Sequence, residues 1–180
     1  ASQLEKPFLY ICSDIVSAQN AAAAIGEYCA GEVVLIPEKE DVLIARKVKN
    51  LSGVYNHNLA LYKLISGNIK GAVVSLEALM QLFPRLDIFK QNILNISVGD
   101  TIELDSLPNK LAQMGYLRQT VLEEQATYTL RGDILDIYPL GATLPVRIEF
   151  FGDNVEKMRT FSLDTMLSVS EVQNVEILPA

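Results

Sequence analysis

The sequence predicts a mixed α/β protein of two modules: a small α/β domain with a parallel sheet over residues 1–93, and an α+β domain with a mainly antiparallel sheet over residues 94–180. Three observations support this. Apolar runs alternate with helical patterns in the first half, strand patterns alone follow residue 116, and the acidic excess lies in the second half. Residues 1–95 carry nine basic and nine acidic side chains, whereas residues 96–180 carry six basic and thirteen acidic ones.

The first module is expected to contain three buried strands separated by helices. The strands are the short apolar runs 8–12, 33–36 and 72–74. Ser13 or Asp14 can cap a helix that follows the first strand and stops at Gly31. A second helix ends at Gly67, and Ser75 caps a short third one. Helices between consecutive strands favour a parallel sheet with helical cover. The charged stretch 38–53 is expected to be a surface connection that could hold a helical turn.

The second module is expected to place one helix against an antiparallel sheet. Apolar residues between 92 and 99 predict its first strand, which stops at Gly99. A helix then opens at Asp105 or Ser106, with Pro108 in its first turn, and Gly115 ends it. The remaining predicted strands are 117–122, 127–131, 133–138, 145–151, 155–161 and 172–178.

Composition argues against several classes of protein. No apolar run approaches the roughly 20 residues that span a bilayer, and the N-terminus lacks a signal segment, so no membrane association and a cytoplasmic location are expected. A net charge of −7 argues against non-specific duplex binding. Cys12 and Cys29 lack CxxC spacing and are interpreted as core thiols in preference to redox or metal ligands. His57 is the only histidine, so no metal site is expected.

The sequence also lacks the motifs of a catalytic or nucleotide-binding site. Neither form of glycine-rich phosphate loop occurs, and the segment from Gly67 to Gly71 leads into a strand, which indicates a turn. Carboxylate pairs such as Asp133 and Asp136 are interpreted as a solvated face. We therefore predict no catalytic residue, no cofactor-binding residue and no metal in this chain.

The predicted strand 145–151 separates two sets of side chains. A period of two places Val146, Ile148 and Phe150 on one face, and Arg147, Glu149 and Phe151 on the other. If the first set is core, Phe151 is exposed. In the strand 127–131, the same alternation puts Arg131 on a polar face with Thr127 and Thr129.

Two arginines and a phenylalanine on exposed strand faces form a candidate anchor set for a protein partner: Arg131, Arg147 and Phe151. Arginine binds carboxylates through two parallel hydrogen bonds, and an exposed aromatic ring gains by leaving water. The alternative remains open: Arg147 pairs with Glu149 or with a neighbouring strand, and Phe151 packs under a loop.

Several segments closely resemble the UvrB-like N-terminal module of bacterial transcription-repair coupling factors (Mfd). They are RGDILDIYP at 131–139, LPVRIEFFGD at 144–153, RTFSLDT at 159–165 and LPA at 178–180, with VGD at 98–100 and MGY at 114–116. UvrB, the nucleotide-excision-repair protein, has a similar segment. The likeness is specific over residues 94–180 and weaker but collinear over residues 1–93.

The resemblance implies a fold and a function. It implies that residues 1–93 resemble UvrB domain 1a and residues 94–180 resemble UvrB domain 2, which in this family docks UvrA. The positions that match its binding residues are Arg131, Arg147 and Phe151. The parent protein would be an ATP-driven translocase, with Mg and ATP in a motor outside this chain, that displaces RNA polymerase stalled on damaged DNA. A C-terminal domain would mask the docking face.

Two alternatives accompany that expectation: a UvrB-type repair domain that binds nucleotide, and direct recognition of nucleic acid. UvrB proper carries a phosphate-binding loop and a DNA-clamping hairpin, and this chain has neither, which favours the coupling-factor resemblance. The acidic second half argues against direct nucleic-acid binding. The stretch 38–58 departs from the aromatic and proline-rich connection of both families. Under the docking hypothesis, Arg147→Ala or Phe151→Ala should abolish UvrA binding and leave the melting temperature nearly unchanged.

Overall fold

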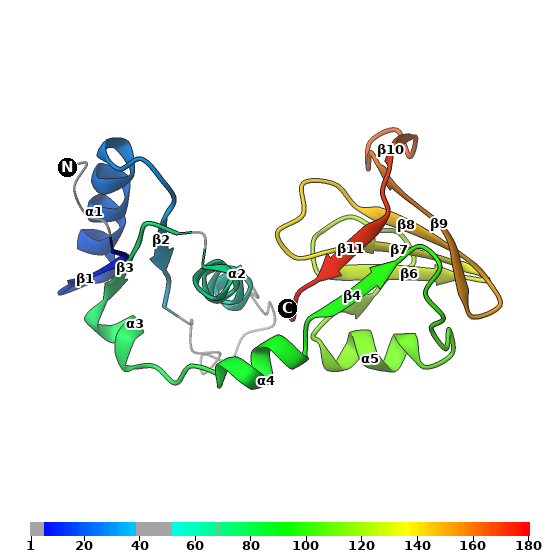
Figure 1. Cartoon of the computed structure of the whole chain (residues 1–180), viewed down its shortest axis with the longest axis horizontal. Helices are drawn as coiled ribbons and strands as arrows, with labels where there is room; N and C mark the ends of the chain where they lie inside the picture. Colours follow the sequence, from blue (N-terminus) through cyan, green and yellow to red (C-terminus); the bar gives the residue numbers. More distant parts are fainter. Residues whose placement is uncertain (1–5, 39–51, 68) are drawn as a thin grey trace. The chain divides into compact units, whose positions relative to one another are not determined.

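A computed structural model describes residues 6–38, 52–67 and 69–180 of the chain. It divides into two compact units, Ala1–Leu86 and Asp87–Ala180 (Figure 1). The sequence places the division a few residues later, between residues 93 and 94. Both divisions leave the strand that begins at Leu94 in the second unit. Each unit has its own sheet and is described by itself.

The first unit contains the predicted parallel sheet. Its strands are β1 (Phe8–Cys12), β2 (Val33–Ile36) and β3 (Gly71–Ser75), in the order β1-β3-β2, and both pairs are parallel. Parallel strands need crossover connections, which the helices α1 (Ile15–Tyr28) and α2 (Ser52–Ser66) supply. The fold class expected for this half is confirmed.

Helices cover both faces of this sheet. On one face, Ala18 and Ala22 of α1 pack against Cys12 and Val73. On the other face, Leu64 of α2 and Ala78 of α3 (Leu76–Met80) pack against Ile36, Ala72 and Val74. Small residues on the helices let them approach the strands closely. The predicted placement of Cys12 in the core is confirmed, whereas Cys29 is only half-buried.

Side-chain caps begin two of the helices where the sequence predicts them. The carboxylate of Asp14 accepts hydrogen bonds from the Ser17 amide (2.9 Å), the Ser17 hydroxyl (2.8 Å) and the Ser13 hydroxyl (2.7 Å). These hydrogen bonds lower the pKa of Asp14 from 3.8 to about 2, and the bond from the Ser17 amide has the largest effect. The Ser75 hydroxyl accepts from the Ala78 amide at 3.1 Å and starts α3.

The charged connection lies partly outside the described residues, which leave out 39–51. Its last two residues, Ser52 and Gly53, begin α2, in keeping with the helical turn that the connection could hold. His57 in this helix is fully buried, and its Nδ1 lies 3.0 Å from the carbonyl oxygen of Pro37. A short helix that the sequence analysis missed, α4 (Leu86–Gln91), leads into the second unit.

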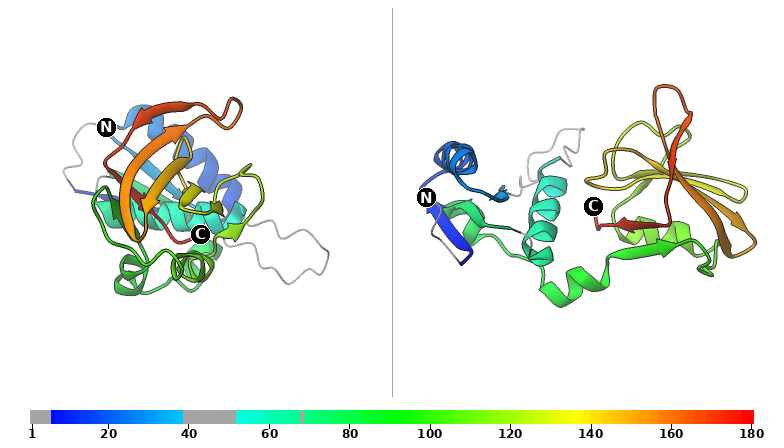
Figure 2. Two further views of the ribbon diagram at one scale, coloured as in Figure 1. Left: turned by 90° about the vertical axis from the view of Figure 1, so that its right-hand side faces the viewer. Right: turned by 45° about the horizontal axis from the view of Figure 1, so that its top comes forward.

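The second unit is built on a six-stranded sheet in the order β10-β9-β8-β7-β6-β5 (Figures 1 and 2). Its strands are β5 (Leu117–Arg118), β6 (Thr127–Arg131), β7 (Ile134–Tyr138), β8 (Val146–Phe151), β9 (Asn154–Phe161) and β10 (Ser168–Glu171). All neighbours pair antiparallel except β5 and β6, which are parallel. The expected mainly antiparallel sheet is confirmed.

Three strand predictions in this unit need correction. The predicted strand 117–122 shrinks to Leu117–Arg118, and the strand β10 was not anticipated. The last strand, β11 (Asn174–Ile177), leaves the main sheet and pairs antiparallel with β4 (Leu94–Ser97). The pairing of strands far apart in the sequence depends on tertiary packing, and the periodic pattern of apolar residues within one strand does not indicate its partner.

The second unit contains most of α4, which was not expected, as well as the expected helix. That expected helix is α5 (Leu107–Gln113), whose Leu107 and Leu111 are fully buried. Gly115 ends it with a φ of +92°, and a Cβ there would lie 2.6 Å from the carbonyl oxygen of Ala180. The backbone amide of Ala180 in turn donates to the carbonyl of Met114 at 2.7 Å. Within the described ranges, no helix combines the length and apolar character that crossing a bilayer requires.

The Asp14 cap predicts a pH-dependent contribution to the stability of the first unit. A carboxylate whose pKa falls on folding stabilises the fold above pH 3.8, and this contribution disappears as the pH drops through about 2. Asn is an equally good uncharged cap. We therefore expect Asp14→Asn to lose less stability between pH 4 and pH 2 than the wild type. Helical circular dichroism melts across this range measure the difference, and identical pH profiles would contradict the role of the cap.

Candidate protein-docking surface

The strands β6 to β9 carry charged side chains on one face of the sheet, here called the outer face. On β8, Val146, Ile148 and Phe150 are buried, whereas Arg147 and Glu149 are half-buried and Phe151 is exposed. The predicted alternation along this strand is therefore confirmed. The outer face consists of Arg131, Asp136, Arg147, Glu149, Phe151, Lys157 and Arg159, together with less polar neighbours.

Phe151 stands at the end of β8 with 72% of its surface exposed. The β8–β9 register shifts between Glu149 and Phe150, and the extra residue belongs to β9. Because the bulge lies in the partner strand, β8 keeps its alternation and Phe151 stays on the outer face. The predicted exposure of Phe151 is confirmed, and packing under a loop is excluded.

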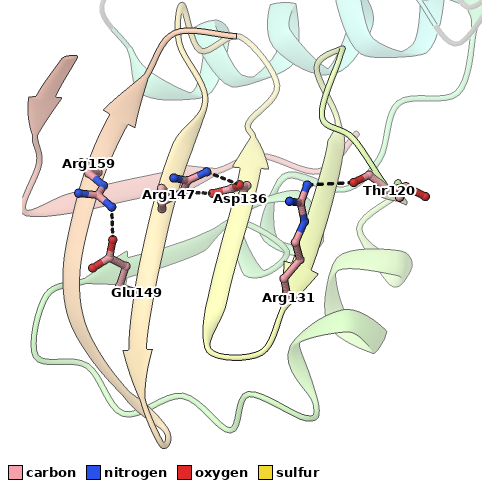
Figure 3. Close-up of polar contacts among 6 residues, drawn as sticks. All are labelled: Thr120, Arg131, Asp136, Arg147, Glu149 and Arg159. Atoms are coloured by element: carbon pink, nitrogen blue, oxygen red, sulfur yellow. Dashed lines mark hydrogen bonds and ion pairs between the residues drawn. The ribbon is translucent and has the colours of Figure 1, made fainter. Parts of the chain in front are cut away.

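Arg147 is bound to a buried carboxylate on the neighbouring strand. Its Nε and Nη2 donate to the two oxygens of Asp136 at 2.6 and 2.8 Å, and the two residues lie directly opposite each other on β8 and β7 (Figure 3). Asp136 is 4% exposed. The interpretation of Asp136 as part of a solvated face is wrong, and of the alternatives left open for Arg147, pairing with a neighbouring strand is observed.

The surroundings of Arg147 hold it as a cation. The hydrogen-bonded Asp136 raises the pKa of Arg147, against the opposing effect of burial. The guanidinium carbon also lies 5.0 Å from the ring centroid of Phe161, which is buried. A cation between a carboxylate and an aromatic ring has little freedom to move, so Arg147 is an ordered group on this face.

A second arginine, which the sequence analysis did not single out, faces Arg147 across the β8–β9 pair. Arg159 lies directly opposite Arg147, and its Nη2 donates to Glu149 (Figure 3). Like charges opposite each other are destabilising unless neighbours compensate them, as Asp136 and Glu149 do here. The alternation along the predicted strand 155–161 could have indicated that Arg159 faces outward. The register of this strand against β8, which places Arg159 opposite Arg147, could not be read from the sequence.

Arg131 lies on the same face, one row and two strands from Arg147. It pairs with Ile134, which in turn pairs with Glu149. Its side chain is exposed, and Nη2 donates to the carbonyl of Thr120 at 3.0 Å (Figure 3). The expected exposure of Arg131 is confirmed. The three predicted residues therefore share one sheet face, with only Arg147 in a buried ion pair.

The polar face expected for β6 requires a correction, because Thr127 and Thr129 are buried. The hydroxyl of Thr127 donates to the carbonyl of Glu124 at 2.6 Å. Together with the Arg131–Thr120 bond, this contact shows that the segment between β5 and β6 packs on this side of β6. The Thr127 hydroxyl is satisfied by a backbone carbonyl and can be buried at low cost. The buried Thr129 hydroxyl has no hydrogen-bond partner among the described residues. The sequence pattern does not distinguish buried threonines from solvated ones.

The glycine segment nearest to a phosphate loop has a structural explanation. Gly67 follows α2 with a φ of +72°, a conformation typical of a helix C-terminus. Gly71 opens β3, and a Cβ there would lie 2.4 Å from the ring of Phe8. Both glycines serve helix termination and packing, as the turn interpretation predicts. Among the described residues, no three His, Cys, Asp or Glu side chains gather as a metal site needs.

Comparison with known proteins finds a family model that matches the sequence of the second unit. Residues 94–180 match the model of the UvrB interaction domain. Over 94% of its length the chain is 26% identical to the transcription-repair-coupling factor of Haemophilus influenzae, and over all of it 26% identical to that of Bacillus subtilis. The second unit contains a UvrB interaction domain, and the chain resembles transcription-repair coupling factors over nearly its whole length. The factor of Myxococcus xanthus is 28% identical over 98% of the chain.

The UvrB-like module is a small part of its relatives, since it spans about 15% of the length of each of these factors. The resemblance inferred from the sequence motifs is confirmed, and with it the link to DNA repair and transcription-coupled repair. The three longest of those motifs, RGDILDIYP, LPVRIEFFGD and RTFSLDT, lie in the sheet that carries the outer face. The matched domain therefore contains the candidate docking surface.

The Asp136–Arg147 pair changes the expected effect of removing Arg147. In Arg147→Ala, Asp136 would remain buried without its partner, and we expect a loss of about 1–3 kcal/mol in the free energy of unfolding. This replaces the expectation of an unchanged melting temperature. Asp136→Asn combined with Arg147→Ala removes the uncompensated charge and should recover part of the loss. Urea unfolding followed by circular dichroism measures both, and a single variant as stable as the wild type would contradict the proposed dependence.

Proposed function

We propose that the outer face of the second unit docks UvrA, so that the chain acts as the recruiting module of a transcription-repair coupling factor. The observation that carries this proposal is Phe151, an aromatic side chain 72% exposed on the same sheet face as three arginines, within the unit that matches the UvrB interaction domain. Exposed aromatic and arginine side chains are the residue types that dominate the energetics of protein interfaces.

The geometry of the outer face supports this role. Arg131, Arg147 and Phe151 are spread over two strands of one sheet, so a single partner surface could contact all three. Rigid strands hold anchors in place better than loops do, which lowers the entropy cost of association. Residues 96–180 as a whole carry six basic and thirteen acidic side chains, and this acidic excess would discourage association with nucleic acid.

The roles of the parent protein are part of the same proposal. The chain contributes no catalysis and no cofactor of its own, and acts as a cytoplasmic adaptor. Regions outside residues 1–180 would bind ATP and Mg, translocate on DNA and displace stalled RNA polymerase. A C-terminal domain of the parent would mask the outer face until it is needed.

The central test is truncation of Phe151. Phe151→Ala removes a ring that contacts water, so the free energy of unfolding should change by no more than about 0.5 kcal/mol. Affinity for UvrA should fall by about 2 kcal/mol, the cost of removing an interface anchor, which is roughly a thirtyfold increase in Kd. Calorimetric titration of the purified chain with UvrA measures the change.

A matched control is available in the same unit. Leu167, in the connection between β9 and β10, is 68% exposed and does not belong to the outer face. Leu167→Ala should leave the affinity for UvrA unchanged. Equal losses in both variants, or wild-type affinity in Phe151→Ala, would refute docking through this face.

A further inference from the structure

The pairing of Arg147 with Asp136 leaves part of the guanidinium group unused. A guanidinium carries five N–H bonds, arranged so that two separate edges can each bind a carboxylate. Asp136 occupies the side edge formed by Nε and Nη2, at 2.6 and 2.8 Å. The end edge, with one N–H from each Nη atom, has no hydrogen-bond partner among the described residues.

The same contacts keep this end edge in a defined orientation. Asp136 and Arg147 lie directly opposite each other on paired strands, so the carboxylate is held by the sheet itself. Phe161 lies against the guanidinium at 5.0 Å and restricts its plane. Arg147 still has 22% of its side chain exposed. The two N–H bonds of the end edge are therefore preorganised, and binding a partner there would cost little side-chain entropy.

The neighbouring charges select the chemistry that this edge can bind. Arg159, directly across the strand pair, adds a second positive charge beside Arg147. The charge of Glu149 also acts on Arg147, but its carboxylate accepts a hydrogen bond from Arg159. Two adjacent guanidinium groups and an open planar fork favour an acidic group, and a carboxylate matches the spacing of the two N–H bonds.

We propose that the end edge of Arg147 receives an aspartate or glutamate side chain of UvrA, and that Asp136 is the positioning residue that aims it. This inference rests on the proposed docking of UvrA and names the chemistry of one contact within it. Asp136 is buried and does not touch the partner; it acts through the orientation and charge of Arg147.

The first experiment separates the fork from the charge. Arg147→Lys keeps a cation that can pair with Asp136, but an ammonium lacks a second planar edge. We expect a melting temperature within a few degrees of the wild type and a Kd for UvrA raised roughly tenfold or more. Arg118→Lys, on β5 and outside the outer face, is the matched control and should leave Kd unchanged. Wild-type affinity in Arg147→Lys, or an equal loss in Arg118→Lys, would overturn the assignment.

The second experiment tests Asp136 as a positioning residue. Asp136→Asn keeps the size of the side chain but releases the guanidinium, and should weaken UvrA binding in the wild-type background. In the Arg147→Lys background, Asp136→Asn should weaken UvrA binding little further, because the guanidinium that Asp136 orients is absent. A purely structural role would give the same loss in both backgrounds, and that result would overturn the proposal.

The third experiment identifies the carboxylate. Each acidic residue of UvrA that the chain protects from hydrogen exchange is changed to its amide and titrated against the wild type and Arg147→Lys. For one acidic residue of UvrA, the change to the amide should weaken binding to the wild-type chain but not to Arg147→Lys. If no acidic residue shows this difference, the carboxylate assignment is overturned. If the wild-type chain shows no binding to UvrA at all, the docking proposal itself fails, which distinguishes the two failures.

Discussion

The buried carboxylate of Asp136 is the constraint on which the outer face depends. A carboxylate that is 4% exposed needs a compensating cation, and Arg147 on the adjacent strand supplies it through two hydrogen bonds. The pair therefore links the register of β7 and β8 to the orientation of a surface arginine. A slip of one residue would bury Arg147 among the core side chains and expose Val146 and Ile148.

This arrangement shows how one residue can serve both stability and recognition. One edge of the Arg147 guanidinium binds the buried Asp136 on the adjacent strand, and the other edge remains available to a partner. Phe151 contrasts with it, because its ring makes no such structural contribution and is 72% exposed. Mutations on the outer face therefore differ in what they report: some change binding alone, and others change folding as well.

Much of the fold follows from local patterns. The three parallel strands, α1 with its Asp14 cap and α3 with its Ser75 cap are all visible as apolar runs followed by capping residues. The alternation of β8 likewise predicts which side chains leave the core. Local patterns failed where pairing is distant, as for β11, which joins β4 rather than the main sheet. They also missed α4, a six-residue helix without a clear periodic face.

For the candidate site, the amino-acid sequence alone determined which side chains of β8 face outward and which family motifs surround them, because both depend on residues adjacent in the chain. Only the tertiary structure decided that Arg147 binds Asp136, that Arg159 faces it, and that Thr127 and Thr129 are covered. The physical reason is that strand register and loop packing are set by the summed contacts of segments far apart in the sequence, which no single periodic pattern contains.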